Sequence, residues 1–232
     1  MLGDCRKEDY KKMFPAMKSP GLVDGDFHLA EGTVGRRFYL YCNLPCPFAI
    51  FFFSLAHPPS TILPGSAILQ YVCEKNGLKR WSGELSSAYR DPVEGRARVN
   101  EYLSSHHTTS RQISSKVFSP ALASLMSKGK KPFTQDHKVE SAAFANEEAS
   151  KFADVWLGKE GGPYVGGFEN PTIADLFAYC EFAQATQMRI LERYEDDKVD
   201  EWIARMKGLD HHDDVHKSLF KLANLFGRVV LK

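Results

Sequence analysis

The sequence lacks an excess of charge of either sign. Its 30 Lys and Arg residues face 29 Asp and Glu residues, which leaves a formal net charge of +1. It also has no long basic run that could follow a phosphate backbone, so the composition argues against nucleic acid as a partner. Hydrophobic residues make up 43% of the 232 positions, enough to bury the core of one larger domain or two small ones. The chain is long enough to be an enzyme, and its charge suits small or apolar ligands.

Charge is missing altogether from one long stretch. From Phe38 to Leu69 there is no Asp, Glu, Lys or Arg, and this stretch contains the run FAIFFFSLA. A run of about 18 or more apolar residues is the usual sign of a membrane span. Pro45 and Pro47 would break a helix near its middle, however. A transmembrane helix is therefore not expected, and a membrane is not a predicted partner.

Cysteine is scarce, and its pattern does not predict disulfides. The five cysteines are odd in number and scattered, and the opening MLGDCRKEDYKK has no apolar signal-peptide core, so we expect a cytoplasmic protein. Cys42 and Cys46 could form a redox or metal pair, but this spacing is a weak signal without further ligands. His212 and His216 have the spacing of a helical metal site, although the acidic residues between them favour a solvated helix start. No metal site is predicted.

Local patterns predict a strand, strand, helix unit at the start of the chain. The segment PGLVDGDFHL is typical of two short strands joined by Asp24 and Gly25, because both turn positions tolerate positive φ. A helix is predicted from Ser66, with Gly77 as its stop, because apolar residues recur there at helical spacing. These apolar residues are Ile68, Leu69, Val72 and Cys73.

Helical patterns dominate the rest of the chain. Asp91, Pro92 and Glu94 suit the N-cap, first and third positions of a capping box, which opens a helix predicted to run as far as Pro120. Further helices are predicted over about 134–157, from a capping box of Thr172 and Asp175, over about 199–206 and over about 212–226.

Three strings, in this order, resemble the glutathione transferase family and its theta class in particular. They are KSPGLVDGDFHLAE with SAILQYVCEK, GRARVNEYLSSHHTTSR, and VGGFENPTIADL. The resemblance implies an α+β to mostly α chain: an incomplete thioredoxin-like, glutathione-binding domain over 1–80, a linker over 81–91, and an all-helical C-terminal bundle over 92–232. Residues 32–65 resemble nothing in the family and are interpreted as an aberrant insertion.

The resemblance also implies a glutathione site. Pro20 matches the family's cis-proline, which would present the backbone of Ser19 to the cysteinyl part of glutathione. Lys18 matches a lysine that meets the glycine carboxylate, and Arg6 matches a second basic residue nearby. Glutathione would be a co-substrate, and no other cofactor is implied.

Two further positions of that glutathione site and an electrophile site follow from the same resemblance. Glu31 and Ser66 match a pair that holds the γ-glutamyl end at a helix N-terminus. Arg111 matches an arginine that faces the apolar electrophile in some theta enzymes. His106 and His107 are interpreted as a helix-surface pair and a pocket wall. A homodimer is the assembly that the family implies.

Two departures from the family bear on activity. The chain begins about where the family's second helix begins, so we expect it to lack the strand and serine that lower the pKa of the glutathione thiol. No catalytic residue is therefore assigned. The segment 32–65 separates Glu31 from Ser66, and FFFSL within it suggests a translated intron. Three readings stay open: an impaired transferase, an inactive ligand-binding or dimerising variant, and an intron-retaining product without stable function.

Overall fold

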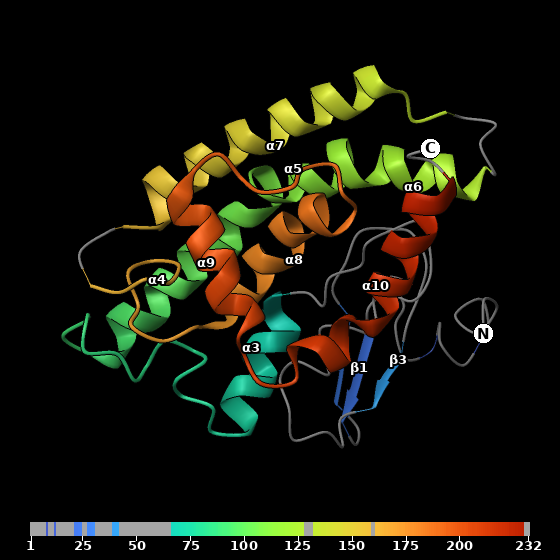
Figure 1. Ribbon diagram of the computed structural model, residues 1–232. Helices are drawn as coiled ribbons and strands as arrows, with labels where there is room; N and C mark the ends of the chain where they lie inside the picture. Colours follow the sequence, from blue (N-terminus) through green and yellow to red (C-terminus); the bar gives the residue numbers. More distant parts are fainter. Residues whose placement is uncertain are drawn as a thin grey trace. The chain divides into compact units, whose positions relative to one another are not determined.

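The structure is a computed structural model, and it describes residues 8, 12, 21–24, 27–30, 39–41, 66–127, 132–158 and 161–229 (Figure 1). The chain divides into two compact units, Met1–Leu78 and Lys79–Lys232. The first unit holds a small sheet and a helix, and the described residues of the second form helices and the turns between them. The chain is thus mostly α, as predicted.

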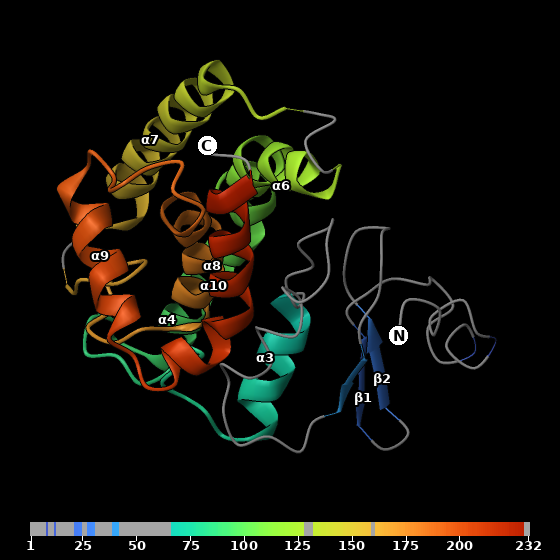
Figure 2. The ribbon, with the colours of Figure 1, turned by 45° about the vertical axis from the view of Figure 1, so that its right-hand side comes forward.

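The sheet begins with a hairpin, as predicted, although Asp24, predicted as a turn residue, is the last residue of its first strand. Strand β1 (Gly21–Asp24) pairs antiparallel with β2 (Phe27–Ala30), and Asp24 lies opposite Phe27 (Figure 2). Two residues therefore separate the strands, the loop length that favours tight hairpin turns. The side chain of Leu22 on β1 is fully buried.

A third strand comes from the segment interpreted as an insertion. Strand β3 (Tyr39–Tyr41) pairs parallel with β1, with Leu22 opposite Leu40, so the strand order is β2-β1-β3. This strand was not predicted from the sequence. The other residues of 32–65 lie outside the described part of the chain.

Helix α3 (Ser66–Lys75) confirms the helix predicted from Ser66. It buries the four predicted side chains, Ile68, Leu69, Val72 and Cys73. Gly77 ends it with φ of +62°, a conformation that glycine adopts without strain. Tyr71 and Lys75 both reach the Asp24 carboxylate at the end of β1, and Tyr71 Oη donates at 2.5 Å. These hydrogen bonds, that of Lys75 first, lower the pKa of Asp24 and tie the helix to the sheet.

The second unit is a helical bundle around one buried helix. Figures 1 and 2 show α8 in the middle, and it contacts α4, α7, α9 and α10. Every α8 residue from Ile173 to Ala185 is buried. The helical elements are α4 (Pro92–Ser105), η2 (His106–Thr108), α5 (Arg111–Ile113), η3 (Ser114–Phe118), α6 (Ser119–Met126), α7 (Gln135–Trp156), α8 (Ile173–Gln187), α9 (Asp197–Lys207) and α10 (His212–Val229).

The single long helix predicted up to Pro120 is wrong, because the segment is broken twice. Asp91 caps α4 as predicted, accepting from the N–H groups of Val93 and Glu94 at 2.7 and 3.0 Å. The backbone then leaves the helical region at Thr109 (φ −119°, ψ −102°), and residues 114–118 form a π-helical turn. Pro120 does not end the helix, since it lies in the first turn of α6, where no N–H donor is needed.

The capping box that opens α8 is confirmed. The N–H of Thr172 donates to Asp175 Oδ2 at 2.8 Å, and the Thr172 hydroxyl accepts from Ala174 N–H at 3.2 Å. Asp175 also accepts from Val165 N–H and from the Trp202 indole, both at 2.9 Å. These bonds join the loop that contains Val165 to α8 and α9, so both capping residues stabilise the fold.

Residues 81–91, predicted as a linker, pack within the second unit. Trp81 is 8% exposed, and its carbonyl accepts from Ile173 N–H at 3.0 Å. Gly83 meets Gly95 of α4 so closely that a Cβ on Gly95 would lie 2.1 Å from the Gly83 carbonyl oxygen. Only glycine fits this crossing of two backbones.

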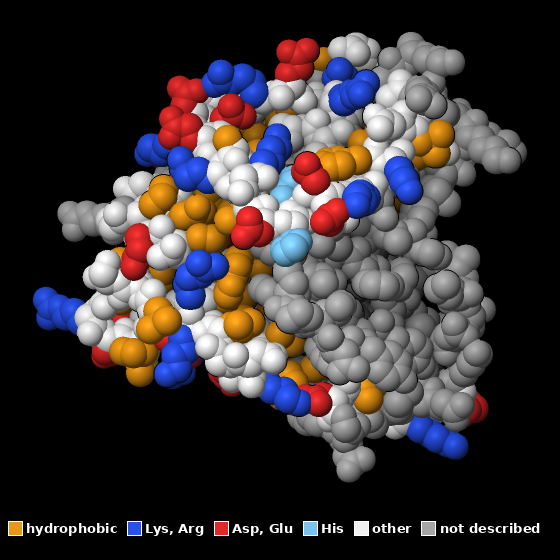
Figure 3. All heavy atoms as spheres, turned by 60° about the horizontal axis from the view of Figure 1, so that its bottom comes forward, with side chains coloured by type: hydrophobic (Ala, Val, Ile, Leu, Met, Phe, Trp, Pro, Cys, Tyr) orange, Lys and Arg blue, Asp and Glu red, His pale blue; other side chains and the backbone are white. Residues whose placement is uncertain are grey.

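Charge is mixed on the surface, as the net charge suggests. On the face in Figure 3, basic and acidic side chains are interspersed, without a large area of one sign. Among the described residues, no helix is both long and apolar enough to span a membrane. Most of the uncharged run from 38 to 69 lies outside those residues.

Candidate functional site

The structure describes one of the predicted glutathione-binding residues. Ser66 is the first residue of α3 and is half-buried. The positive end of the helix dipole makes this a position that favours a carboxylate. The remaining positions of the predicted site lie outside the described residues: Lys18, Ser19, Glu31, Arg6 and Pro20.

Arg111 and His107, the predicted electrophile-site residues, both belong to the break between α4 and α6. Arg111 begins α5, and its side chain is 24% exposed. Its Nη1 lies 3.8 Å from Oε1 of Glu181 on α8. His107 is exposed, and its ring packs edge-on against His106 with centroids 5.6 Å apart.

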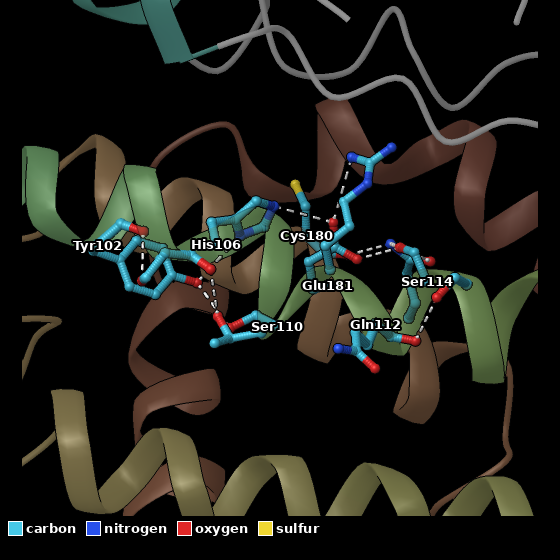
Figure 4. Close-up of polar contacts among 12 residues, drawn as sticks. Tyr102, His106, Ser110, Gln112, Ser114, Cys180 and Glu181 are labelled. Carbon is cyan, nitrogen blue, oxygen red and sulfur yellow. Dashed lines mark hydrogen bonds and ion pairs between the residues drawn. The ribbon is translucent and has the colours of Figure 1, made fainter. Parts of the chain in front are cut away.

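Glu181 is the centre of a buried polar cluster that the sequence analysis missed. Its carboxylate is fully buried, and Figure 4 shows His106 and Ser114 on opposite sides of it. The Ser114 hydroxyl donates to Oε2, while Gln184 Nε2 donates to the same hydroxyl at 3.0 Å. Ser114 is the first residue of the π-helical turn, so the break in the helix places its hydroxyl beside Glu181. Such turns recur at functional sites.

His106 closes the cluster on the side away from Ser114. It is fully buried, so its interpretation as a helix-surface residue is wrong. Its Nε2 lies 3.4 Å from Glu181 Oε1, and its Nδ1 lies 3.4 Å from Tyr102 Oη. Tyr102 in turn donates to the Ser110 hydroxyl at 3.2 Å. Burial raises the pKa of Tyr102 far above its ordinary value, so its hydroxyl remains a donor.

Two buried polar atoms at one edge of the cluster lack a hydrogen-bond partner among the described residues. Glu181 Oε1 and His106 Nε2 are buried, and neither has a hydrogen-bond partner within the described part of the chain. The two atoms lie within ion-pair distance of each other, and Glu181 Oε1 lies within ion-pair distance of Arg111 as well. Buried polar atoms are nearly always hydrogen-bonded, so two such atoms without a described hydrogen-bond partner are an unusual feature of this cluster.

The cluster holds no thiolate nucleophile. Cys180 precedes Glu181 on α8, and burial raises the pKa of its thiol well above the ordinary value. Burial likewise raises the pKa of Cys73 on α3 to about 12. A thiol with so high a pKa stays protonated and unreactive at neutral pH.

One signal in the sequence could have indicated Glu181. It is the single charged side chain of the otherwise apolar or neutral stretch LFAYCEFAQAT. A lone charge at a position where every face of the helix is buried must find partners. The sequence around His106 and Ser114 has no comparable signal, because their partner, Glu181, lies on another helix.

His212 and His216 are buried, so the interpretation of a solvated helix start is wrong for their side chains. They are 4% and 1% exposed, and their rings stack with centroids 4.0 Å apart. His216 Nδ1 lies 2.7 Å from the His212 carbonyl oxygen, and His212 Nε2 lies 2.7 Å from Tyr179 Oη. Across the described ranges, no group of three or more His, Cys, Asp and Glu side chains could hold a metal ion.

Comparison with known proteins identifies the fold. A human theta-class glutathione transferase, in complex with the glutathione conjugate of 1-menaphthyl sulfate, matches 97% of this chain and 76% of its own, with TM-score 0.63 and 21% identity. A delta-class glutathione transferase of Nilaparvata lugens matches 98% of this chain and 83% of its own, with TM-score 0.54 and 17% identity. No protein-family model matches, and neither does any curated protein. The chain therefore has the glutathione transferase fold, with a thioredoxin-like sheet and helix followed by an all-helical bundle.

Proposed function

We propose that the protein is a theta-class-like glutathione transferase, which conjugates glutathione to electrophilic small molecules as a cytosolic homodimer. The observation that carries the proposal is the fold match together with Arg111, a partly exposed cation held against buried Glu181 in the helical unit. In the reaction the glutathione thiol loses its proton, its sulfur bonds to the electrophilic carbon, and the leaving group departs with its electron pair.

Each predicted residue has a role in this proposal. Lys18 and Arg6 bind the glycine carboxylate of glutathione, Ser19 contacts its cysteinyl part through the backbone beside Pro20, and Glu31 with Ser66 holds its γ-glutamyl end. The electrophile lies near Arg111 and His107. Holding both reactants in place is the main contribution that these residues make to the rate.

Conjugation is weak in this chain, because residues 32–65 separate Glu31 from Ser66. The same separation supports the second candidate, a protein that binds apolar ligands or pairs with another subunit without chemistry. It equally supports the third reading, an intron-retaining product without stable function. Each reading predicts a different combination of glutathione binding and turnover.

The experiment is a calorimetric titration with glutathione of the whole protein, Ser66→Ala and Ser104→Ala. Ser104 is an exposed serine of α4 and serves as the matched control. We expect Ser66→Ala to weaken binding about tenfold, since a hydrogen bond to a charged group contributes about 1.5–3 kcal/mol. Ser104→Ala should bind like the unmodified protein. Equal affinities for all three would contradict the assignment of Ser66.

Turnover is measured with two electrophiles that share a naphthylmethyl carbon. They are 1-menaphthyl sulfate, whose glutathione conjugate is present in the human theta-class structure, and uncharged 1-(chloromethyl)naphthalene. Glutathione binding with slow release of sulfate or chloride supports the transferase. Glutathione binding without release of either ion favours the second candidate, and a chain that neither binds glutathione nor unfolds cooperatively favours the third.

A further inference from the structure

The polar cluster of the helical unit has one member that solvent can reach. Arg111 is 24% exposed, whereas Glu181, His106 and Ser114 are buried. A ligand that approaches the cluster therefore meets the Arg111 side chain first, and Oε1 of the buried Glu181 carboxylate lies 3.8 Å from Arg111 Nη1.

The carboxylate is fixed in that position. Ser114 donates to its Oε2, and Gln184 holds the Ser114 hydroxyl from the far side. Its Oε1 lies between His106 Nε2 at 3.4 Å and Arg111 Nη1 at 3.8 Å. A group packed in this way cannot turn away when a ligand arrives, so its charge acts on whatever binds at Arg111.

We propose that Glu181 is a positioning residue which, through Arg111, sets the charge preference of the electrophile site, so that the site takes uncharged apolar electrophiles in preference to anionic ones. This inference rests on the proposed function, which places the electrophile near Arg111.

The physical reason is charge balance. Arg111 alone would attract an anion, but the Arg111 and Glu181 pair carries no net charge. Because Glu181 is buried, dissolved salt screens its repulsion of an anion far less than it screens exposed charges. Arg111 can still donate hydrogen bonds to neutral acceptors and pack its stem against an apolar ligand. The pair thus offers donors and apolar contact without a net attraction for negative charge.

The test uses two fluorescent probes of the same shape that differ in charge. 8-Anilinonaphthalene-1-sulfonate is anionic, and N-phenyl-1-naphthylamine is its uncharged analogue without the sulfonate. Their dissociation constants are measured by fluorescence titration for the whole protein and for Glu181→Gln, Glu181→Asp and Arg111→Gln. The readout is the affinity for the anionic probe divided by the affinity for the uncharged probe. A general loss of packing would not shift this ratio toward the anion.

We expect Glu181→Gln to raise the preference for the anionic probe about tenfold, because a unit charge about 7 Å away at an effective permittivity of about 20 changes affinity by more than one decade before screening. Glu181→Asp keeps the charge and should keep the original ratio. Arg111→Gln leaves the carboxylate unbalanced and should lower the ratio by a similar factor.

A double variant keeps the test decisive if Glu181→Gln does not fold. Arg111→Gln/Glu181→Gln restores charge balance with two neutral side chains of similar size, so its ratio should exceed that of Arg111→Gln about tenfold.

The inference is overturned if removing the Glu181 charge leaves the ratio unchanged while Arg111→Gln lowers it. If Arg111→Gln changes neither probe, the electrophile does not bind at Arg111 and that part of the proposed function fails as well.

Discussion

His216 shows how strongly one buried side chain can depend on its neighbours. Its ring is 1% exposed and packs against the rings of His212 and Phe220, with centroids 4.0 and 5.9 Å away. Burial, more than any nearby charge, lowers the pKa of His216 to about 3. The unfolded chain binds a proton at this residue near pH 6.5, whereas the folded chain does so only near pH 3.

This difference predicts a pH dependence of stability. Between about pH 6.5 and pH 3 the unfolded state holds more protons, so His216 should lower the free energy of unfolding by up to about 1.4 kcal/mol for each unit of falling pH. His216→Asn cannot be protonated, and its amide can still donate to the His212 carbonyl. We expect it to unfold with a flatter pH dependence, measured by urea denaturation between pH 4 and 7.

The control for this prediction is His211→Asn. His211 is 65% exposed with φ of +64°, a backbone conformation that asparagine tolerates. Its curve should run parallel to that of the unmodified protein. Parallel curves for the unmodified protein and His216→Asn would mean that His216 is protonated equally in both states.

At the residue scale, the capping residues could be predicted from sequence and the polar cluster could not. Asp91 and Thr172 bond to groups two or three positions away, so the pattern that predicts them is local. Glu181 meets His106 and Ser114 only after α8 packs beside η2 and η3. Nothing near His106 in the sequence distinguishes a buried partner of a carboxylate from a surface histidine.

The same limit appears at the scale of elements. The hairpin of β1 and β2 could be predicted, because its two strands and the residues that favour the turn are contiguous in the sequence. Strand β3 depends on a distant partner, because a strand is stabilised by what pairs with it more than by its own residues. The break between α4 and α6 was missed for a related reason, since the π-helical turn is held by contacts with α8.

Two proline substitutions test whether β3 is part of the sheet. Successive N–H groups of a strand point to opposite sides, so one of Leu40 and Tyr41 donates toward β1 and the other away from it. Leu40→Pro and Tyr41→Pro should therefore differ: one removes a bond of the ladder, and the other serves as its control. We expect one variant, not both, to speed amide hydrogen exchange in Gly21–Asp24 by about tenfold or more, a loss of more than about 1 kcal/mol of local stability.

Unchanged exchange in both variants would show that residues 32–65 do not contribute a strand to the sheet. Faster exchange in one variant would instead make this segment a structural part of the first unit. Deleting the whole segment would then remove a strand as well as the interruption between Glu31 and Ser66.

At the scale of the whole molecule, the order of the recognised strings was enough to predict the plan of the fold. The comparisons agree with it at 21% and 17% identity. Buried contacts hold the helical unit together. They include the Asp175 bonds to Val165 and Trp202 and the rings of Phe152 and Trp202, with centroids 5.2 Å apart.

This self-contained core predicts that residues 79–232 fold alone. All three tryptophans, Trp81, Trp156 and Trp202, belong to this unit, and they are 8%, 6% and 0% exposed. Tryptophan fluorescence of the whole chain therefore reports on the helical unit. Urea unfolding followed by fluorescence should give the isolated unit and the whole chain the same free energy of unfolding within about 15%, the uncertainty of the extrapolation. A clearly lower value for the isolated unit would mean that its core draws stability from the first 78 residues, and the two units would then have to be treated as one cooperative structure.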